Sequence, residues 1–353
     1  MPSAKTEATE LSVGFGLLGF ADPTATGLDI DALFEGTLSP RTFSAYVQEY
    51  LKNTREYQRF TRIGLELRRV RFGDNVTCVC WTGIQQQAAT VMASKDLFVP
   101  AANTPISVKD NSNVVANPSP HNLFRSLPAG MVVASQAEDW FLEKDYSGIQ
   151  ALYAYASGVY NARMDASSSE LPGEVGDYYR QTKRAGRKHF QNFIKSELTT
   201  GEFVRFNDLY VKMCAQVARE SADEFNAHLA ALPGNTHSAV YETVVKQFFR
   251  INSVAYILAG LDGNRPFAVQ IPDLTTWKRD WMVQSVRAQP RPGRGQSVVE
   301  VLVEVQNKTS RERYSMPFHV EIRWSHGKFC GNPEGKLYKE FAWRDTPFFV
   351  SLF

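Results

Sequence analysis

Polar and apolar residues alternate between Asp96 and Lys109 in the way expected of two half-buried β-strands. An apolar run, 97–99, follows Asp96 directly, and a second run, 106–109, ends on Lys109 after a polar turn. Within the second run Ser107 and Lys109 fall on one face, because successive side chains of a strand point to opposite sides. Asp96 and Lys109 lie 109 − 96 = 13 positions apart, a separation that a hairpin can close. The pattern predicts that one hairpin brings the two side chains together.

Helical periodicity surrounds this hairpin. Apolar residues recur at helical spacing over 40–71, which indicates two helices, the second running from about residue 55 to residue 69. The same spacing returns in three later segments: 137–160, 203–231 and 239–250. Beyond residue 250 the chain changes to β-rich runs separated by turns. The sequence therefore predicts an α/β (α+β) fold with an α/β core, a helical middle and a mainly β C-terminal domain.

Composition changes indicate where the chain divides. At 353 residues it is long for one domain. The stretch 165–176 is rich in Ser, Gly and Pro, as linkers and exposed loops are. The expected division is an N-terminal arm over 1–39, an α/β core over 40–165, a helical basic segment over 166–240 and a β-rich domain over 241–353.

Overall composition points to an ordinary globular protein. The hydrophobic fraction is 43 % and the net charge is +2, so charge alone indicates no particular partner. No apolar run approaches the length of a membrane span, and no signal-peptide pattern opens the chain. The four cysteines lack the spacing of a zinc knuckle and are interpreted as reduced thiols. We therefore expect a cytoplasmic protein with no membrane partner.

The hairpin residues resemble the signature of the restriction-endonuclease-like, or PD-(D/E)XK, nuclease superfamily. That signature is an aspartate, a variable loop and then acid-x-Lys on the next strand; here Asp96 and Ser107-Val108-Lys109 occupy those places. The resemblance implies a restriction-endonuclease-like core in which Asp96 binds Mg²⁺ or Mn²⁺ and Lys109 positions or activates water. Hydrolysis of a phosphodiester by a divalent ion needs a hard carboxylate and a nearby cation of this kind.

Ser107 departs from the superfamily pattern because a serine stands where the second acid is expected. One anionic metal ligand is therefore missing. Either Glu66 or a glutamine such as Gln85 supplies the oxygen, or the site is weak or inactive. Glu66 lies on an expected helix before the hairpin and would match the helical glutamate that many superfamily members place near the metal.

The most basic part of the chain lies between residues 178 and 195. On one helix, five cations would fall on a single face and attract phosphates without reading sequence: Arg180, Lys183, Arg184, Arg187 and Lys188. A solvated helix face is the plainer alternative. Arg291 and Arg294 sit in a Pro/Gly-rich loop suited to a groove or a backbone contact. Asn111 and Asn113, directly after the lysine strand, are candidate substrate contacts or simple turn formers.

Two functions remain open on these residues. The first is a Mg²⁺-dependent DNA endonuclease of restriction or phage-defence type, which follows from the resemblance. The second is a non-catalytic nucleic-acid-binding or assembly protein, such as a nucleoprotein, a capsid-like protein or an inactive nuclease fold. Ser107 favours the second, and in that case the glycine-rich stretch 13–20 would be an oligomer contact. A homo-oligomer is compatible with both.

Overall fold

The computed structural model describes residues 4–25, 27–82, 95–110, 113–130, 140–163, 170–234, 236–291, 295–325 and 327–353. Within these ranges the chain forms helices and two β-sheets, which confirms the expected mixed α/β class. Two hydrophobic cores accompany the two sheets.

The first sheet combines strands from both ends of the chain. Its order among the described residues is β1 (Cys80–Trp81), β2 (Leu97–Val99), β3 (Thr104–Asp110), β5 (Tyr256–Asp262), β6 (Arg265–Ile271) and β11 (Val350–Ser351). β2 and β3 form the expected hairpin, with Leu97 opposite Ile106. Neighbouring strands are antiparallel except β3 and β5, which run parallel with Ile106 opposite Ile257. An N-terminal hairpin is thus joined to a hairpin from far along the sequence.

Helices from the start of the chain share a hydrophobic core with the first sheet. They are α1 (Ala4–Leu17), α2 (Ile30–Leu33), α3 (Pro40–Lys52) and α4 (Thr54–Leu67). α1 and α4 approach so closely that a Cβ on Gly16 would lie 2.1 Å from the Thr61 carbonyl oxygen, and one on Gly64 would lie 2.1 Å from that of Val13. Only glycine permits this contact between helix backbones. The segment 1–39, expected as an arm, therefore contributes a helix whose second half is buried in the core.

The second sheet is antiparallel throughout. Its order among the described residues is β4 (Val114–Ala116), β10 (Glu334–Lys339), β9 (Arg313–Arg323), β8 (Ser297–Asn307) and β7 (Trp281–Arg291). Buried and half-buried positions alternate along β8 and β9, as in a sheet with one covered face. The long helix α9 (Thr200–Ala230) packs against β7 and β8. It begins at a capping box between Thr199 and Glu202.

Shorter helices complete the structure. The α-helices are α5 (Trp140–Lys144), α6 (Tyr146–Arg163), α7 (Val175–Gln181), α8 (Arg184–Ser196), α10 (His237–Phe248) and α11 (Leu274–Asp280). Single π-helical turns occupy Arg68–Phe72 and Asn122–Ser126, and 3₁₀ turns occupy Gly73–Asn75, Pro100–Ala102 and Trp343–Asp345. α6 packs against α9, so this helical layer covers one side of the second sheet.

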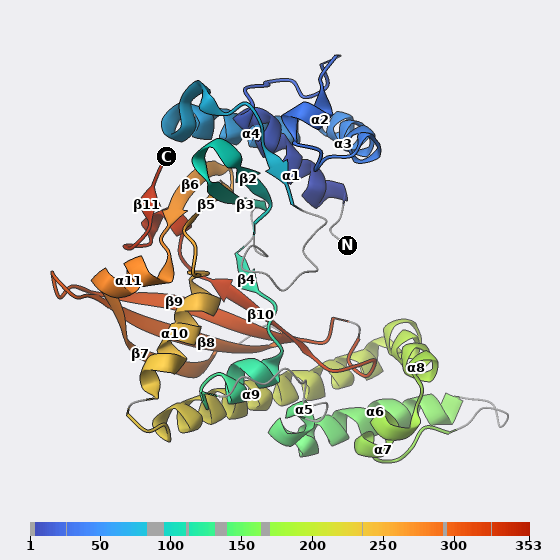
Figure 1. Cartoon of the computed structure of the whole chain (residues 1–353). Coiled ribbons are helices and arrows are strands. Elements are labelled where there is room, and N and C mark those ends of the chain that lie inside the picture. The colour runs from blue at the N-terminus through green and yellow to red at the C-terminus, as the bar shows by residue number, and fades with distance from the viewer. Residues whose placement is uncertain are drawn as a thin grey trace.

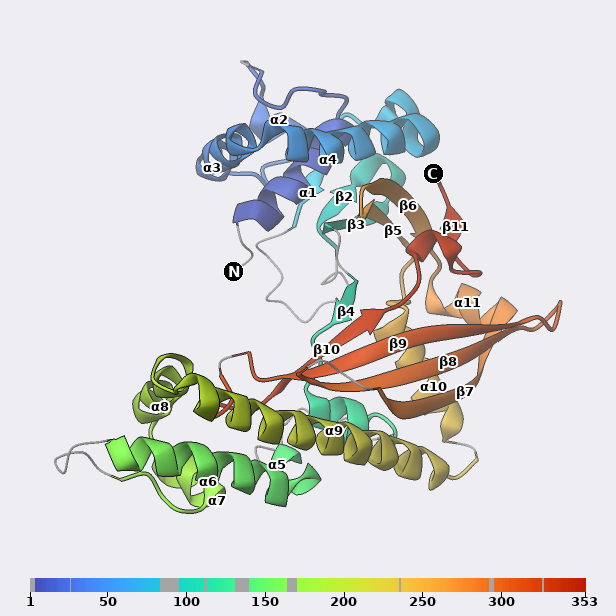
Figure 2. The ribbon, with the colours of Figure 1, turned by 180° about the vertical axis from the view of Figure 1, so that it is seen from behind.

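The chain passes between the two sheets more than once. Figures 1 and 2 show the first sheet with α1 to α4 at one end of the molecule and the second sheet with α9 at the other, with β4 between them. The chain enters the second sheet after β3 and returns to the first at β5. The strands expected in one β-rich domain over 241–353 are consequently shared by both sheets.

Candidate active site

Asp96 lies buried directly before β2 and next to Ser107 of β3. Its exposed fraction is 6 %. The Ser107 hydroxyl donates to Asp96 Oδ2 at 3.1 Å, and the backbone N–H of Val108 donates to the same oxygen at 2.6 Å. Two donors therefore fix the carboxylate beside β3. The hairpin brings Asp96, Ser107 and Lys109 into one region, as expected from the alternation.

Glu10 on α1 is a site residue that the sequence reasoning missed. It is 5 % exposed, and its Oε2 accepts a hydrogen bond from Trp81 Nε1 at 2.9 Å. The pKa of Glu10 is raised to about 8, first by burial and next by the negative charge of Asp96, while Trp81 and Lys109 act in the opposite direction. The available signal was one glutamate inside the otherwise uncharged stretch 8–17.

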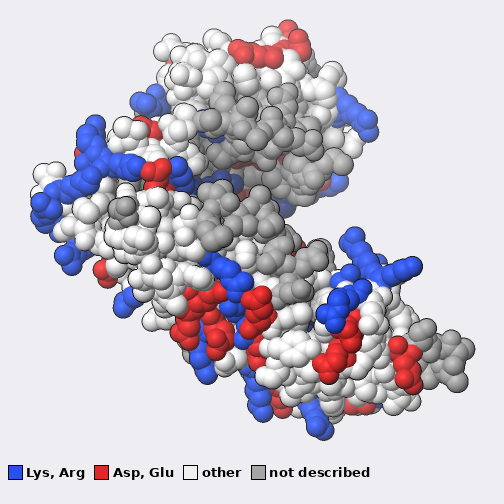
Figure 3. Space-filling model, turned by 60° about the horizontal axis from the view of Figure 1, so that its bottom comes forward, with Lys and Arg blue, Asp and Glu red and all other residues white. Residues whose placement is uncertain are grey.

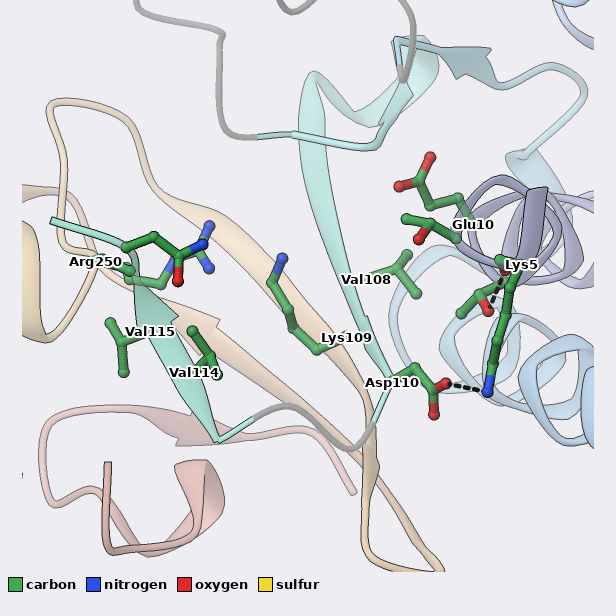
Figure 4. Close-up of a pocket in the computed structure, with 12 residues that line it drawn as sticks. Lys5, Glu10, Val108, Lys109, Asp110, Val114, Val115 and Arg250 are labelled. Carbon is green, nitrogen blue, oxygen red and sulfur yellow. Dashed lines mark hydrogen bonds and ion pairs between the residues drawn. The ribbon is translucent and has the colours of Figure 1, made fainter. Parts of the chain in front are cut away.

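Lys109 lies in a pocket of about 400 Å³ that Glu10 and Arg250 also line. Burial lowers the pKa of Lys109, and the positive charge of Arg250 lowers it further, whereas the carboxylates of Asp96 and Glu10 raise it. Figure 4 shows Lys109 and Arg250 extending into the same space on one side of β3, with Glu10 projecting from α1 on the other side. One carboxylate from α1 and two cations, one from β3 and one from the residues after α10, thus line one pocket beside β3.

Glu10 and Asp96 are the carboxylates that could serve as ligands of a hard divalent cation here. Glu10 and Asp96 are carboxylates close enough for the charge of one to raise the pKa of the other, and a bound cation would remove that repulsion. Within the described ranges, no three His, Cys, Asp or Glu side chains form a group that could hold a metal. Mg²⁺ commonly binds through one or two carboxylates and keeps several waters, and Mn²⁺ favours the same oxygen ligands. The residues present therefore suit Mg²⁺ or Mn²⁺ better than a metal that needs a closed protein cage.

The two residues expected to replace the missing acid are placed differently. Glu66 lies on α4 with its side chain 36 % exposed, and it pairs with Arg69, whose Nε lies 3.0 Å from Glu66 Oε2. It is not among the residues that line the Lys109 pocket. Gln85 lies outside the described residues. α1 rather than α4 thus presents a carboxylate to Asp96.

The expected basic helix is in fact two helices, which corrects the prediction of one cationic face. α7 ends at Gln181, Thr182 has extended backbone angles, and α8 begins at Arg184 with Lys183 as its N-cap residue. The break has a packing cause. On one continuous helix the buried Tyr178 and Ile194 would point roughly 160° apart, so both could not face the same core.

The five cations accordingly lie in different surroundings. Arg180 on α7 pairs with Asp177 at 2.5 Å. Arg187 is half-buried, and its guanidinium lies 5.8 Å from the centre of the Tyr179 ring. Lys183, Arg184 and Lys188 are exposed at the start of α8. Figure 3 shows Lys and Arg side chains in several separate groups on the face that it presents, interspersed with Asp and Glu.

Two of the four loop residues expected to contact nucleic acid have partners within the protein, and the other two are not described. Arg291, at the end of β7, pairs with Glu340. The Asn113 side-chain oxygen accepts a hydrogen bond from Lys339 Nζ at 3.1 Å. Asn111 and Arg294 lie outside the described residues. Arg291 and Asn113 therefore have structural partners within the second sheet and its edge.

Comparisons with known proteins give no relative. No protein-family model matches the chain, and neither a curated protein nor a solved structure is similar to it. None of the helices that the structure describes combines the length and apolar character that a membrane span requires. The geometry of the site itself therefore carries the functional argument.

Proposed function

We propose that this chain is a metal-dependent endonuclease that hydrolyses phosphodiester bonds in DNA, in a restriction or phage-defence setting in the cytoplasm. The observation that supports the proposal is the meeting of Glu10, Asp96 and Lys109 around β3. Two carboxylates with a cation beside them are what metal-assisted phosphodiester hydrolysis requires. The burial of Glu10 and Lys109 and their shifted pKa values also favour a functional site over a merely structural one.

The order of elements gives further support. β1 follows the helix α4, Asp96 precedes β2, and β3 bears Lys109. Helix, strand, strand with a carboxylate, strand with a lysine is the order of the restriction-endonuclease-like common core. α1, which bears Glu10, precedes α2, α3 and α4 in the chain, so Glu10 would act in place of Glu66 through the packing of α1 beside β3.

Each residue has a distinct role in the proposed reaction. Glu10 and Asp96 would hold Mg²⁺ or Mn²⁺, which would supply Lewis-acid activation of water and of the phosphate. Ser107 and the Val108 N–H orient Asp96 through their hydrogen bonds to Oδ2. Lys109 positions the attacking water and stabilises negative charge that develops on the phosphate oxygens.

One observation favours a second candidate, a nucleic-acid-binding protein without catalysis. Ser107 occupies the place of the second acid and donates a hydrogen bond to Asp96, so it adds no negative charge to the site. Such a protein would bind nucleic acid with a steep salt dependence and no need for metal.

Cleavage of plasmid and single-stranded DNA with Mg²⁺ or Mn²⁺ tests the proposal. We expect wild-type protein to cut, and Asp96→Asn, Glu10→Gln and Lys109→Ala to cut about 10²- to 10⁴-fold more slowly, the usual loss when a group acting on the reacting atoms is removed. Urea unfolding of each variant establishes that it is folded.

The outcomes separate the two functions. Equal cleavage by wild type and Asp96→Asn would exclude this site as the nuclease centre. Binding without cutting, unchanged by EDTA and by Asp96→Asn, would support the non-catalytic candidate instead.

A further inference from the structure

Arg250 is held in an unusual backbone conformation beside the site. It follows α10 and has φ +59°, a left-handed value that side chains other than glycine rarely adopt. Its carbonyl oxygen accepts hydrogen bonds from the Tyr256 hydroxyl at 3.1 Å and from Asn252 Nδ2 at 3.2 Å. Such a conformation is unfavourable for a residue other than glycine and persists because its surroundings fix it. The position from which the Arg250 side chain leaves the backbone is therefore fixed.

The guanidinium of Arg250 has no carboxylate partner at ion-pair distance within the described ranges. It shares the pocket with Lys109, and Figure 4 shows the two side chains extending into the same space. The charge of Arg250 contributes to lowering the pKa of Lys109, so the two cations repel each other in the absence of an anion. Two convergent cations of this kind form a binding site for an anion such as phosphate.

A second pocket begins where the first ends. It also has a volume of about 400 Å³, and the two share Arg250, Asn117 and the β4 residues Val115 and Ala116. Beyond Arg250 the second pocket is lined by polar amides and one lysine: Asn122, Lys246, Gln247 and Asn252. Lys246 pairs with Glu242 at 2.7 Å, which partly neutralises it. Arg250 is thus the cation at the junction of the two pockets.

We propose that Arg250 binds a backbone phosphate of a nucleic-acid strand that runs from the Lys109 pocket along β4 into the pocket beside α10. This inference rests on the proposed function, because it takes the Lys109 pocket as the place of cleavage. A strand fits the two adjoining pockets better than a single nucleotide, since the second pocket extends beyond Arg250. Its amides offer both donors and acceptors to the sugar or base of the adjoining nucleotide.

Binding of a fluorescently labelled oligonucleotide to the full-length protein tests the proposal. Fluorescence anisotropy in EDTA, and separately in Ca²⁺, is measured against salt for wild type, Arg250→Gln and Arg250→Lys. Arg265→Gln is the matched control, because Arg265 is exposed at the start of β6 and lines neither pocket. A mononucleotide replaces the oligonucleotide in a parallel series.

We expect Arg250→Gln to weaken oligonucleotide binding about tenfold, the usual effect of one charge-assisted hydrogen bond. The slope of log K against log salt should also decrease by about 0.7 to 0.9, as expected when one phosphate contact is lost. Arg250→Lys should keep the slope, and Arg265→Gln should change neither quantity. A folding defect alone would not alter the slope in this charge-dependent way.

An unchanged slope in a folded Arg250→Gln protein would overturn the inference, as would a mononucleotide that binds as tightly as the oligonucleotide. Cleavage assays with Mg²⁺ separate this failure from failure of the proposed function. If wild type cuts DNA while Arg250→Gln keeps the slope, the endonuclease stands and the phosphate assignment falls. If wild type binds but never cuts while Arg250→Gln reduces the slope, the phosphate assignment stands and the endonuclease falls.

Discussion

The two sheets differ in how their strands come together. In the second sheet β7, β8, β9 and β10 are neighbours in space in the order in which they occur in the chain, and burial alternates along β8, β9 and β10. In the first sheet β3 pairs with β5, which lies far away in sequence, and the charged Glu10 and Asp96 are buried around the hairpin. Local pattern therefore determines strands β7 to β10 of the second sheet, to which only β4 of the described strands comes from far along the chain, whereas the first sheet depends on long-range contacts and accommodates acidic side chains that stability alone would not favour.

Buried charges in the two sheets illustrate the difference. Lys339 of the second sheet is 4 % exposed, and its Nζ donates to the side-chain oxygen of Asn113 at 3.1 Å and to the Phe341 carbonyl at 2.7 Å. The same ammonium lies 5.4 Å from the centre of the Trp343 ring. Neutral groups thus provide the hydrogen-bond acceptors and the ring contact of the Lys339 ammonium, which indicates a structural role. Glu10 instead lies near another carboxylate, so its ionisation depends on what binds there.

Gly16→Ala should have the largest effect on stability. The added methyl would lie 2.1 Å from the Thr61 carbonyl oxygen and would force α1 away from α4, which bears that oxygen. We expect a loss of about 3 kcal/mol in the free energy of unfolding, measured by urea denaturation. Because α1 bears Glu10, metal-dependent activity should fall as well.

Gly158→Ala is the matched control for that substitution. Gly158 is exposed in α6, and nothing lies within 4 Å of its added methyl group. The same chemical change should there be neutral or stabilising by about 0.5 to 1 kcal/mol. Equal destabilisation by both substitutions would contradict the close α1–α4 contact.

Glu10→Gln should change how stability depends on pH. The pKa of Glu10 is about 8 in the folded chain, against an ordinary value of 4.5. Protonation therefore stabilises the folded state; this contribution is complete below pH 4.5, declines as pH rises and is lost above pH 8. The variant cannot ionise, so it should be more stable than wild type at pH 8.5, by an amount of order 1 kcal/mol.

Urea unfolding at pH 5.5 and pH 8.5 provides the measurement, with Mg²⁺ absent. Parallel pH profiles for wild type and Glu10→Gln would show that Glu10 ionises as an ordinary surface glutamate does. Added Mg²⁺ should stabilise wild type more at pH 8.5 than at pH 5.5, because the metal binds the deprotonated carboxylate.

Glu66→Gln should have the smallest effect. Glu66 pairs with Arg69 at the surface of α4, and exposed ion pairs contribute little to stability. We expect no resolvable change in the urea midpoint and no change in DNA cleavage. Loss of cleavage comparable to that of Glu10→Gln would assign the helical carboxylate to α4 and not to α1.

Sequence alone identifies the parts of the site that are close in the chain. Alternation over 106–109 and a short polar turn are enough to place Ser107 beside Asp96 in a hairpin. Glu10 reaches the site because α1 packs against β3, and Arg250 reaches it because β3 pairs in parallel with β5. Neither contact leaves a local pattern. The break between α7 and α8 likewise follows from the direction of the core, which helical periodicity in charged residues does not reveal.

The parallel pairing of β3 and β5 has a consequence for synthesis of the protein. The ribosome must reach residue 262 before the strand that bears Lys109 gains its second neighbour. Arg250 also leaves the ribosome immediately before β5 does. A nascent or prematurely ended chain therefore carries the hairpin with one open edge and lacks a complete centre. For the proposed endonuclease, this timing would confine activity to chains that extend beyond residue 262.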